Sequence, residues 1–293
     1  FFSLIPFVEH GDEVMIVDPS YPNNFQAVEI LGGVPVSVPV RPETGFELEI
    51  EEFERRLTDK TKLVILTNPN NPTTVVYSRK SLEQLAAFIV KHDLLAIVDQ
   101  AFEDIVYDGR EMVSLGSLEG MLQKTVTIFS ISKGMGLSGF RVGCIVASDR
   151  LIDTLFASAV SVVGATNTAA QLAAIAAYGK RDELIAEYSA IFDRRRRFVY
   201  DALSDIPGVR MQMPQSAFLS WIDVSQLGTS DEIVDYLVRE AKVFVNSGNC
   251  YGSQGEGYIR LVQGCYADDA DIEQAVLRIR EALLNKSRER GIS

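Results

Sequence analysis

The stretch TVTIFSISKGMGLSGFRVGCIVAS, residues 125–148, holds a clear fold signal and the most specific chemical signal of the chain. TVTIFSIS and FRVGCIVAS are predicted strands, and the loop between them contains Lys133 and three glycines. Glycine lets the backbone approach an anion closely, and Ser130, Ser132 and Arg141 supply hydroxyl and guanidinium donors that suit a phosphate. Because partial burial and a nearby cation favour a neutral amine, Lys133 is chemically suited to form an imine.

Strand and helix patterns alternate on the N-terminal side of this stretch. The predicted strands are EVMIVD at 13–18, PVSVPV at 35–40, KLVILTNP at 62–69 and LLAIVDQ at 94–100. Stretches with helical spacing of apolar residues lie between them, as in SRKSLEQLAAFIVKHD at 78–93. Strands that alternate with helices of this length predict βαβ units and a mostly parallel sheet, and their nearly continuous apolar character predicts helices on both faces.

The C-terminal part of the chain has a different character. A long helical region ends near DALSDI, and it is followed by VRMQMPQSAFLSWIDV, VFVNSG and GYIRLVQG as predicted strands and ADIEQAVLRIREALLNK as a closing helix. We therefore expect an α/β large domain over residues 1–190 and a smaller α+β domain over residues 191–293, with the boundary inside the long helix. The consecutive basic residues Arg194 to Arg197 are interpreted as a solvated helix face rather than a nucleic-acid site.

Composition limits the classes of function. A chain of 293 residues with 47% hydrophobic and 23% charged residues is typical of a globular protein. The net charge of −12 argues against binding to nucleic acid or to anionic membranes, and no apolar run is long enough to span a bilayer. Cys144, Cys250 and Cys265 form no metal-binding pattern, so we expect no metal and a reducing, cytoplasmic setting. FFSLIPFVEHGDEV has no signal-peptide pattern, and we expect that an N-terminal portion of the natural large domain is missing.

Four further segments carry candidate site residues on or after predicted strands. TNPNNPT at 67–73 follows a strand, and Asp99 ends the strand LLAIVD, where ligands of open α/β sheets bind. PSYPNNF at 19–25 places an aromatic ring in a proline-rich turn. GEGYIRLVQG at 255–264 places Arg260 on an apolar strand, where an unpaired guanidinium would be costly. The forked arrangement of guanidinium N–H donors suits a carboxylate partner.

Taken together, these segments resemble those of the class I/II aminotransferases, which depend on pyridoxal 5′-phosphate (PLP) and have fold type I, the aspartate aminotransferase-like fold. Ser-x-Ser-Lys, followed eight residues after the lysine by Arg-Val-Gly, is similar to the PLP-lysine signature of this family. The resemblance extends in the right order over essentially the whole chain. It implies that Lys133 forms a Schiff base with the cofactor and that Ser130 and Arg141 hold the cofactor phosphate.

The resemblance also implies roles for four other residues. Asn71 would donate a hydrogen bond to the 3-oxygen of the pyridine ring, Asp99 would pair with the protonated ring nitrogen, and Tyr21 would stack on the ring. Arg260 would bind the α-carboxylate of the substrate. The implied activity is the transfer of an amino group between an L-amino acid and a 2-oxo acid, with Lys133 moving the proton, in a homodimer.

Departures from the family pattern keep alternatives open. Phe102 stands where many members have a tyrosine, Thr74 stands where a glycine follows Asn-Pro-Thr, and members carry a longer N-terminal portion. The same constellation serves PLP-dependent C–S lyases, decarboxylases and racemases, which Phe102 favours. A third alternative is the PLP-sensing domain of a transcription regulator, which a helix-turn-helix upstream would indicate. The complete set of Lys133, Asp99 and Arg260 favours an enzyme that acts on amino acids.

Overall fold

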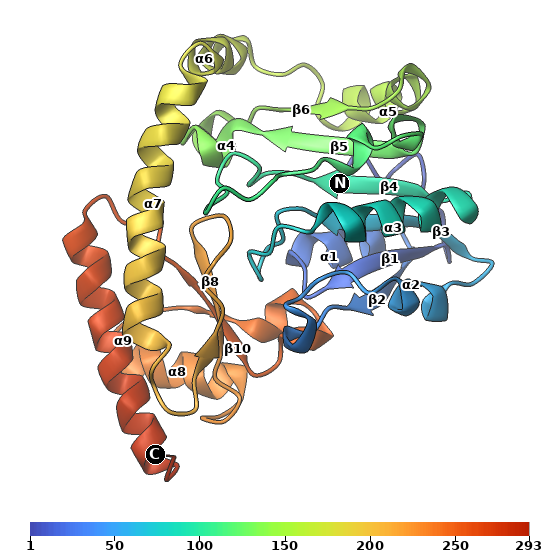
Figure 1. Ribbon diagram of the computed structural model, residues 1–293. Helices are drawn as coiled ribbons and strands as arrows, with labels where there is room; N and C mark the ends of the chain where they lie inside the picture. Colours follow the sequence, from blue (N-terminus) through green and yellow to red (C-terminus); the bar gives the residue numbers. More distant parts are fainter. Residues whose placement is uncertain (293) are drawn as a thin grey trace.

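The computed structural model describes residues 1–292 and contains a larger and a smaller sheet. The long helix α7, Arg181–Leu203, runs from α4 beside the larger sheet to β8 of the smaller sheet (Figure 1). The larger sheet has six strands in the order β2-β1-β3-β4-β5-β6, all parallel except β6. The smaller sheet is antiparallel, with the order β7-β8-β10-β9. The predicted α/β class, with a mostly parallel sheet and a smaller α+β part, is confirmed.

Strands and α-helices alternate along the chain as far as β4, and only 3₁₀ turns lie between β4 and β5. The first part comprises β1 (Glu13–Asp18), α1 (Pro22–Ile30), β2 (Val34–Pro39), α2 (Ile50–Arg56), β3 (Thr61–Thr67), α3 (Arg79–Lys91), β4 (Leu95–Asp99), β5 (Thr125–Ser130), α4 (Ile131–Gly134) and β6 (Gly143–Val146). The remainder comprises α5 (Asp149–Val162), α6 (Thr168–Tyr178), α7, β7 (Arg210–Met211), β8 (Leu219–Asp223), α8 (Ser230–Glu240), β9 (Asn246–Ser247), β10 (Tyr258–Val262) and α9 (Asp269–Glu289). None of the helices within residues 1–292 is both long and apolar enough to cross a membrane.

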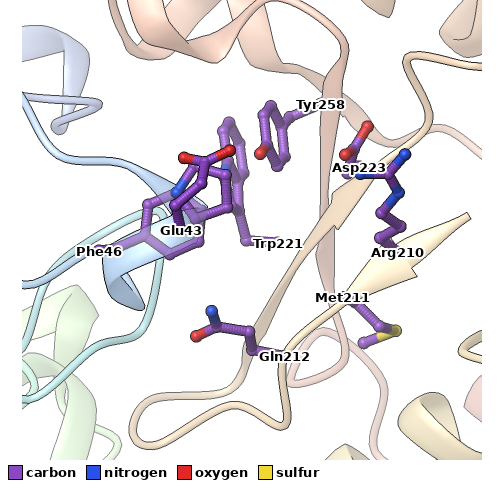
Figure 2. A pocket seen from close by; sticks show the side chains of 9 residues that line it. Glu43, Phe46, Arg210, Met211, Gln212, Trp221, Asp223 and Tyr258 are labelled. Carbon is purple, nitrogen blue, oxygen red and sulfur yellow. The ribbon is translucent and has the colours of Figure 1, made fainter.

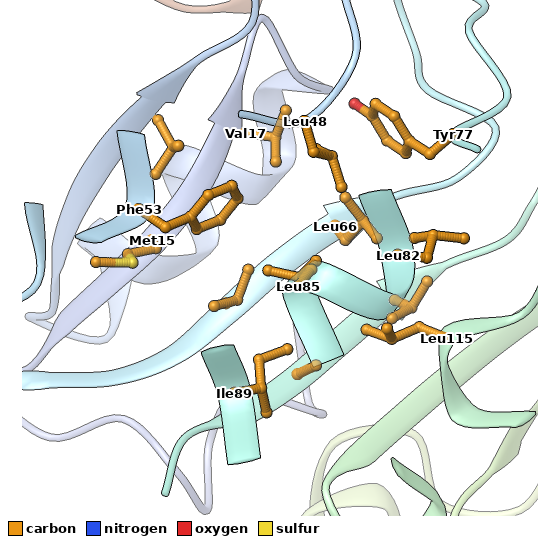
Figure 3. Close-up of a cluster of buried hydrophobic side chains, with 14 of the residues drawn as sticks. Met15, Val17, Leu48, Phe53, Leu66, Tyr77, Leu82, Leu85, Ile89 and Leu115 are labelled. Atoms are coloured by element: carbon orange, nitrogen blue, oxygen red, sulfur yellow. The ribbon is translucent and has the colours of Figure 1, made fainter. Parts of the chain in front are cut away.

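Helices cover both faces of the larger sheet, as its apolar strands predict. On β1, Met15 and Val17 pack in a cluster with side chains of α2 and α3, several of which Figure 3 shows. Val14 and Ile16 point to the other face, where α1 and α5 close a second cluster. Because successive side chains of a strand point to opposite faces, a strand that is buried on both faces must be apolar throughout.

The structure differs from the predicted strands on the two sides of Lys133. The lysine lies in the four-residue helix α4 rather than in a loop. After it, Arg141 adopts left-handed backbone angles, with φ of 54°, at the end of the 3₁₀ turn Ser138–Phe140. The chain then runs back along β5, so the strand predicted over FRVGCIVAS is reduced to the antiparallel edge strand β6.

The long helical region consists of α5, α6 and α7, and the boundary expected at residue 190 falls inside α7. The interpretation of Arg194–Arg197 as a solvated face is wrong for two of the four residues. Arg195 is buried, bonds Asp269 through Nε at 2.7 Å, and donates to backbone carbonyls of the loop 263–267. The buried charge of Arg195 therefore has polar partners inside the fold, which the run of four basic residues in the sequence does not reveal.

Arg196 is fully buried and has a different set of partners. It donates to the carbonyl of Pro214 at 2.7 Å, to Asp108 at 2.7 Å and to Asp193 at 2.6 Å. Its guanidinium carbon lies 4.1 Å from the centroid of the Tyr107 ring. This arrangement joins α7 to the loop that follows β4, which carries part of the site described below.

Replacement of Arg196 by Met is expected to lower the free energy of unfolding by about 3 kcal/mol, because it removes a buried donor from two carboxylates and leaves the carbonyl of Pro214 without its donor. Arg197 is the matched control, since it bonds the same two carboxylates, Asp108 and Asp193, but its side chain is 51% exposed. Arg197→Met is expected to change stability little, because exposed ion pairs contribute little. Urea denaturation measures the free energy of unfolding of both variants. Equal losses in the two would mean that burial of Arg196 does not add to its contribution to stability.

Candidate active site

The candidate side chains follow the carboxyl ends of four neighbouring strands. Tyr21 comes three residues after β1 ends, Asn71 four residues after β3 ends, and Asp99 is the last residue of β4. Ser130 ends β5 and is followed by α4, which contains Lys133. Because these four strands are parallel neighbours, their carboxyl ends share one edge of the sheet, the edge at which ligands of open α/β sheets bind.

The amino group of Lys133 has no hydrogen-bond or ion-pair partner among residues 1–292. Its Nζ lies 5.8 Å from the centroid of the Phe102 ring and 5.7 Å from that of Phe218. Phe102, the residue that departs from the family pattern, is buried in a cluster with Ile105 and Leu219. The lysine therefore projects between two aromatic rings instead of into open solvent.

These surroundings shift the ionisation of the lysine. Burial lowers the pKa of Lys133, the charges of Arg260 and Arg141 lower it further, and the carboxylate of Asp99 opposes them. The neutral amine, which is the nucleophilic and basic form, is thus more populated at neutral pH than for an exposed lysine.

The surroundings of Asp99 stabilise the charged form of its carboxylate only weakly. Its Oδ1 accepts a hydrogen bond of 2.9 Å from the amide of Ala101. Burial raises the pKa of Asp99, and the Ala101 amide and the charge of Lys133 act in the opposite direction. Within the described residues 1–292 no cation forms an ion pair with it, so a protonated ring nitrogen at this place would stabilise its charged form.

Donors suitable for a phosphate flank the lysine. The hydroxyl of Ser130 caps α4 by accepting a hydrogen bond of 3.1 Å from the amide of Ser132, and its own hydrogen can still be donated. Arg141 is exposed and uses one guanidinium nitrogen to donate to the carbonyl of Ser138 at 2.6 Å. The other guanidinium donors of Arg141 remain available to an anion.

Arg260 lies in the middle of β10, and the structure brings it to Asn71. One guanidinium nitrogen donates to Oδ1 of Asn71 at 2.9 Å, and the other to Oδ1 of Asn246 at 3.0 Å. The guanidinium carbon lies 4.8 Å from the centroid of the Tyr251 ring. Burial lowers the pKa of Arg260, and the phenols of Tyr251 and Tyr21 oppose this shift.

The charge of Arg260 is therefore half-buried against neutral amide oxygens, with no carboxylate near enough for an ion pair within residues 1–292. Its Nε is buried and without a hydrogen-bond partner. A guanidinium fork in such a place fits an anion that comes from outside the protein, and a carboxylate matches its geometry. Tyr21, at the start of α1, is partly exposed and free to contact a ligand.

Three residues of the site were missed by the sequence interpretation: Phe218, Asn246 and Tyr251. Phe218 lies in the predicted strand pair and Asn246 in VFVNSG, but nothing local marks either residue as facing the site. Tyr251 lies in a turn between β9 and β10. No local pattern marks Asn246 or Tyr251, because both reach Arg260 only through the pairing of β9 with β10.

The unpaired groups fit PLP. A free amine and a carboxylate without a cation lie at one edge of the larger sheet, and a guanidinium without an anion reaches the same place from the smaller sheet through Asn71, as the cofactor and a carboxylate-bearing substrate together would require. Hydroxyl and guanidinium donors beside the amine match a phosphate.

Comparison with known proteins gives a consistent result. Residues 3–279 match the family described as aminotransferase class I and II. The chain is 34% identical to the aspartate aminotransferase of Pyrococcus abyssi over 289 residues, which make up 97% of this chain and 73% of that protein. It is 33% identical, with the same coverage, to aromatic-amino-acid aminotransferase 2 of Thermococcus litoralis. The crystal structure of an aromatic aminotransferase from Pyrococcus horikoshii matches with a TM-score of 0.92 and 32% identity, over 99% of this chain and 77% of that one.

Proposed function

The chain belongs to the class I and II aminotransferase family and is a transaminase, and from this premise we propose that the residues at the sheet edge bind PLP and an amino-acid substrate. The observation that carries the proposal is the amine of Lys133, which lies unpaired between two aromatic rings with its pKa lowered. When bound, the cofactor supplies an electron sink for the bond that is broken at Cα.

Lys133 and Asp99 are proposed to have the two central roles. Lys133 would hold the cofactor through Nζ and, once an amino acid has displaced it, would take a proton from the Cα of the substrate as a general base and deliver it to C4′ of the cofactor as a general acid. The lowered pKa supports this role, because a base must be neutral near the working pH. Asp99 keeps the pyridine nitrogen protonated.

The other side chains at this sheet edge are proposed to hold and orient the cofactor. Asn71 uses Oδ1 to accept from Arg260, which leaves its amide NH₂ to donate to the 3-oxygen of the ring. Ser130 and Arg141 bind the phosphate, and Tyr21 stacks on the ring. Holding the ring plane in this way keeps the bond to be broken aligned with the π system.

Arg260 is proposed to orient the substrate by its α-carboxylate. For the substrate side chain we propose an acidic or an aromatic group, in line with the activities in the names of the aspartate and aromatic aminotransferases that resemble this chain. The Phe218 ring is only partly buried and lies 5.7 Å from Nζ of Lys133, so it adds apolar character beside the lysine. This favours the aromatic alternative.

The test is an absorbance titration of the protein with PLP, followed by addition of L-aspartate, L-phenylalanine, L-tyrosine and L-alanine. Binding through Lys133 is expected to give a visible band, and a true donor is expected to replace it by the near-ultraviolet band of the aminated cofactor and to release a 2-oxo acid. A band that never changes with any donor would contradict the assignment of these residues to transamination.

Replacement of Arg260 by Lys is expected to weaken amino-acid binding about 10- to 100-fold, because a charge-assisted hydrogen bond contributes about 1.5–3 kcal/mol and a lysine cannot form the fork. PLP affinity is expected to stay within about twofold, since the guanidinium contacts the substrate side of the site. Dissociation constants for PLP and for a non-reacting amino-acid analogue measure both effects. Equal losses would mean that Arg260 has a purely structural role.

We propose further that the protein is a cytoplasmic homodimer, with a PLP-binding domain over residues 1–190 and a smaller domain over 191–293. Large apolar side chains on α5 and α6 are exposed, namely Phe156, Val160, Leu172, Ile175 and Tyr178. Exposed apolar side chains of this size on two helices support contact with a second copy. The three cysteines are free and exposed, which supports a reducing compartment. The mass in solution tests the dimer.

A further inference from the structure

The carboxylate of Asp18, at the end of β1, is fully buried and has no cation near it within residues 1–292. It is held by neutral donors alone. Oδ2 accepts from the hydroxyl of Ser37 at 2.5 Å, and from the hydroxyl and the amide of Ser253 at 2.7 and 3.0 Å. Oδ1 accepts from the amide of Gln254 at 3.2 Å. A buried carboxylate is tolerated only when its lone pairs are satisfied in this way.

The partners belong to parts of the chain that are far apart. Ser37 lies on β2, beside β1 in the same sheet, whereas Ser253 and Gln254 lie between β9 and β10. A Cβ at Gly252, where φ is +117°, would collide with Oδ1 of Asp18, so the close approach requires glycine. The amide of Ser20 adds a hydrogen bond of 2.8 Å to the carbonyl of Tyr251. The segment 251–254 is therefore attached to the end of β1.

The two sides of this attachment carry different parts of the proposed site. On the β1 side, Tyr21 follows Asp18 by three residues. On the other side, the Tyr251 ring packs against the guanidinium of Arg260. We propose that Asp18 is a positioning residue, which holds the segment 251–254 on the end of β1 and so sets the Arg260 guanidinium relative to the Tyr21 ring. The proposal rests on the proposed function, because it assigns Arg260 to the substrate carboxylate and Tyr21 to the cofactor.

The chain contains a built-in reporter of this segment. Trp221 is its only tryptophan. The Trp221 ring stacks on Tyr258 with centroids 4.9 Å apart and meets Tyr251 edge to face at 5.6 Å. Figure 2 shows Trp221 and Tyr258 together at a cavity of about 310 Å³, which is also lined by Phe46 and by residues of β7. Displacement of Tyr251 is therefore expected to change the fluorescence of Trp221.

Two serine variants form a matched test. Ser253→Ala and Ser37→Ala each remove one hydroxyl donor from the same oxygen of Asp18, but only Ser253→Ala weakens the link between segment 251–254 and β1. Ser253→Ala is expected to raise the dissociation constant of a non-reacting amino-acid analogue about 5- to 10-fold, which matches the typical contribution of one hydrogen bond. It is expected to shift the Trp221 emission, while PLP affinity stays within about twofold.

Ser37→Ala and Ser253→Ala are expected to lower the unfolding midpoint in urea by similar amounts. Unlike Ser253→Ala, Ser37→Ala is expected to leave the affinity for the analogue and the Trp221 emission unchanged. Asp18→Asn, which keeps the shape but turns one acceptor into a donor, is expected to exceed Ser253→Ala in both readouts. Equal effects of the two serine variants, or wild-type affinity in both, would overturn the positioning role alone. A wild-type protein that binds PLP but no amino acid would overturn the proposed function and the positioning role with it.

Discussion

The Lys133→Ala variant is expected to lose transamination by about 10⁴-fold or more, because one side chain is assigned both the attachment of the cofactor and the proton transfer. PLP is expected to bind weakly and without the visible band, since the remaining contacts of the phosphate and the ring stay in place. The measurements are single-turnover rates with an excess of amino acid and the absorbance of the PLP-loaded variant.

A second readout separates loss of chemistry from loss of fold. The pKa of Lys133 is lowered by burial and by two arginines, which means that the folded protein binds this proton less tightly than the unfolded chain. The charged amine therefore costs stability in the folded state at neutral pH, and the cost disappears as the pH rises. Lys133→Ala is thus expected to be at least as stable to urea as the parent. Lys133→Arg is the control that keeps a cation but lacks a usable base, and it is expected to be equally inactive. Activity in either variant would refute the role.

Asp99→Asn is expected to lower kcat about 10²- to 10³-fold, equivalent to about 3–4 kcal/mol in the barrier, because a neutral amide cannot keep the ring nitrogen protonated. The substitution keeps the size of the side chain and its acceptor for the Ala101 amide, so the local fold is expected to persist. Steady-state kinetics and PLP dissociation constants measure the effect.

Glu103 provides a matched carboxyl for that experiment. Burial raises its pKa to about 7, and it lies in the same turn after β4, but it has no assigned contact with cofactor or substrate. Glu103→Gln is expected to retain most of the parent activity. Comparable losses in Asp99→Asn and Glu103→Gln would mean that the turn as a whole matters and that Asp99 has no special partner.

The sequence predicts most of the larger sheet because its signals are local. EVMIVD and LLAIVD are nearly continuous apolar runs, which are typical of strands covered by helices on both faces. The predicted strand at 13–18 agrees with β1, and the candidate residues at 71, 99 and 130–133 follow strands of known direction. Once those strands are parallel, their side chains must meet at one edge.

The remainder depends on contacts between distant residues, which no local pattern records. Asn246 and Tyr251 reach Arg260 only because β9 pairs with β10. The bonds of Asp18 to Ser253 span 235 positions. The basic run at 194–197 gave a wrong interpretation for two of its members for the same reason, because most of the carboxylates and carbonyls that pair with Arg195 and Arg196 lie outside α7, 18 to 88 positions away.

The two buried arginines of α7 also restrict how the protein can change its length. Arg195 bonds the loop 263–269, and its neighbour Arg196 bonds Asp108 and Pro214, so adjacent residues of one helix serve two separate loops. One residue inserted upstream within α7 would turn both side chains by about 100° and separate each from its partners. We therefore expect natural relatives to gain or lose residues in the connecting loops. The number of residues in α7 itself is expected to stay constant during evolution.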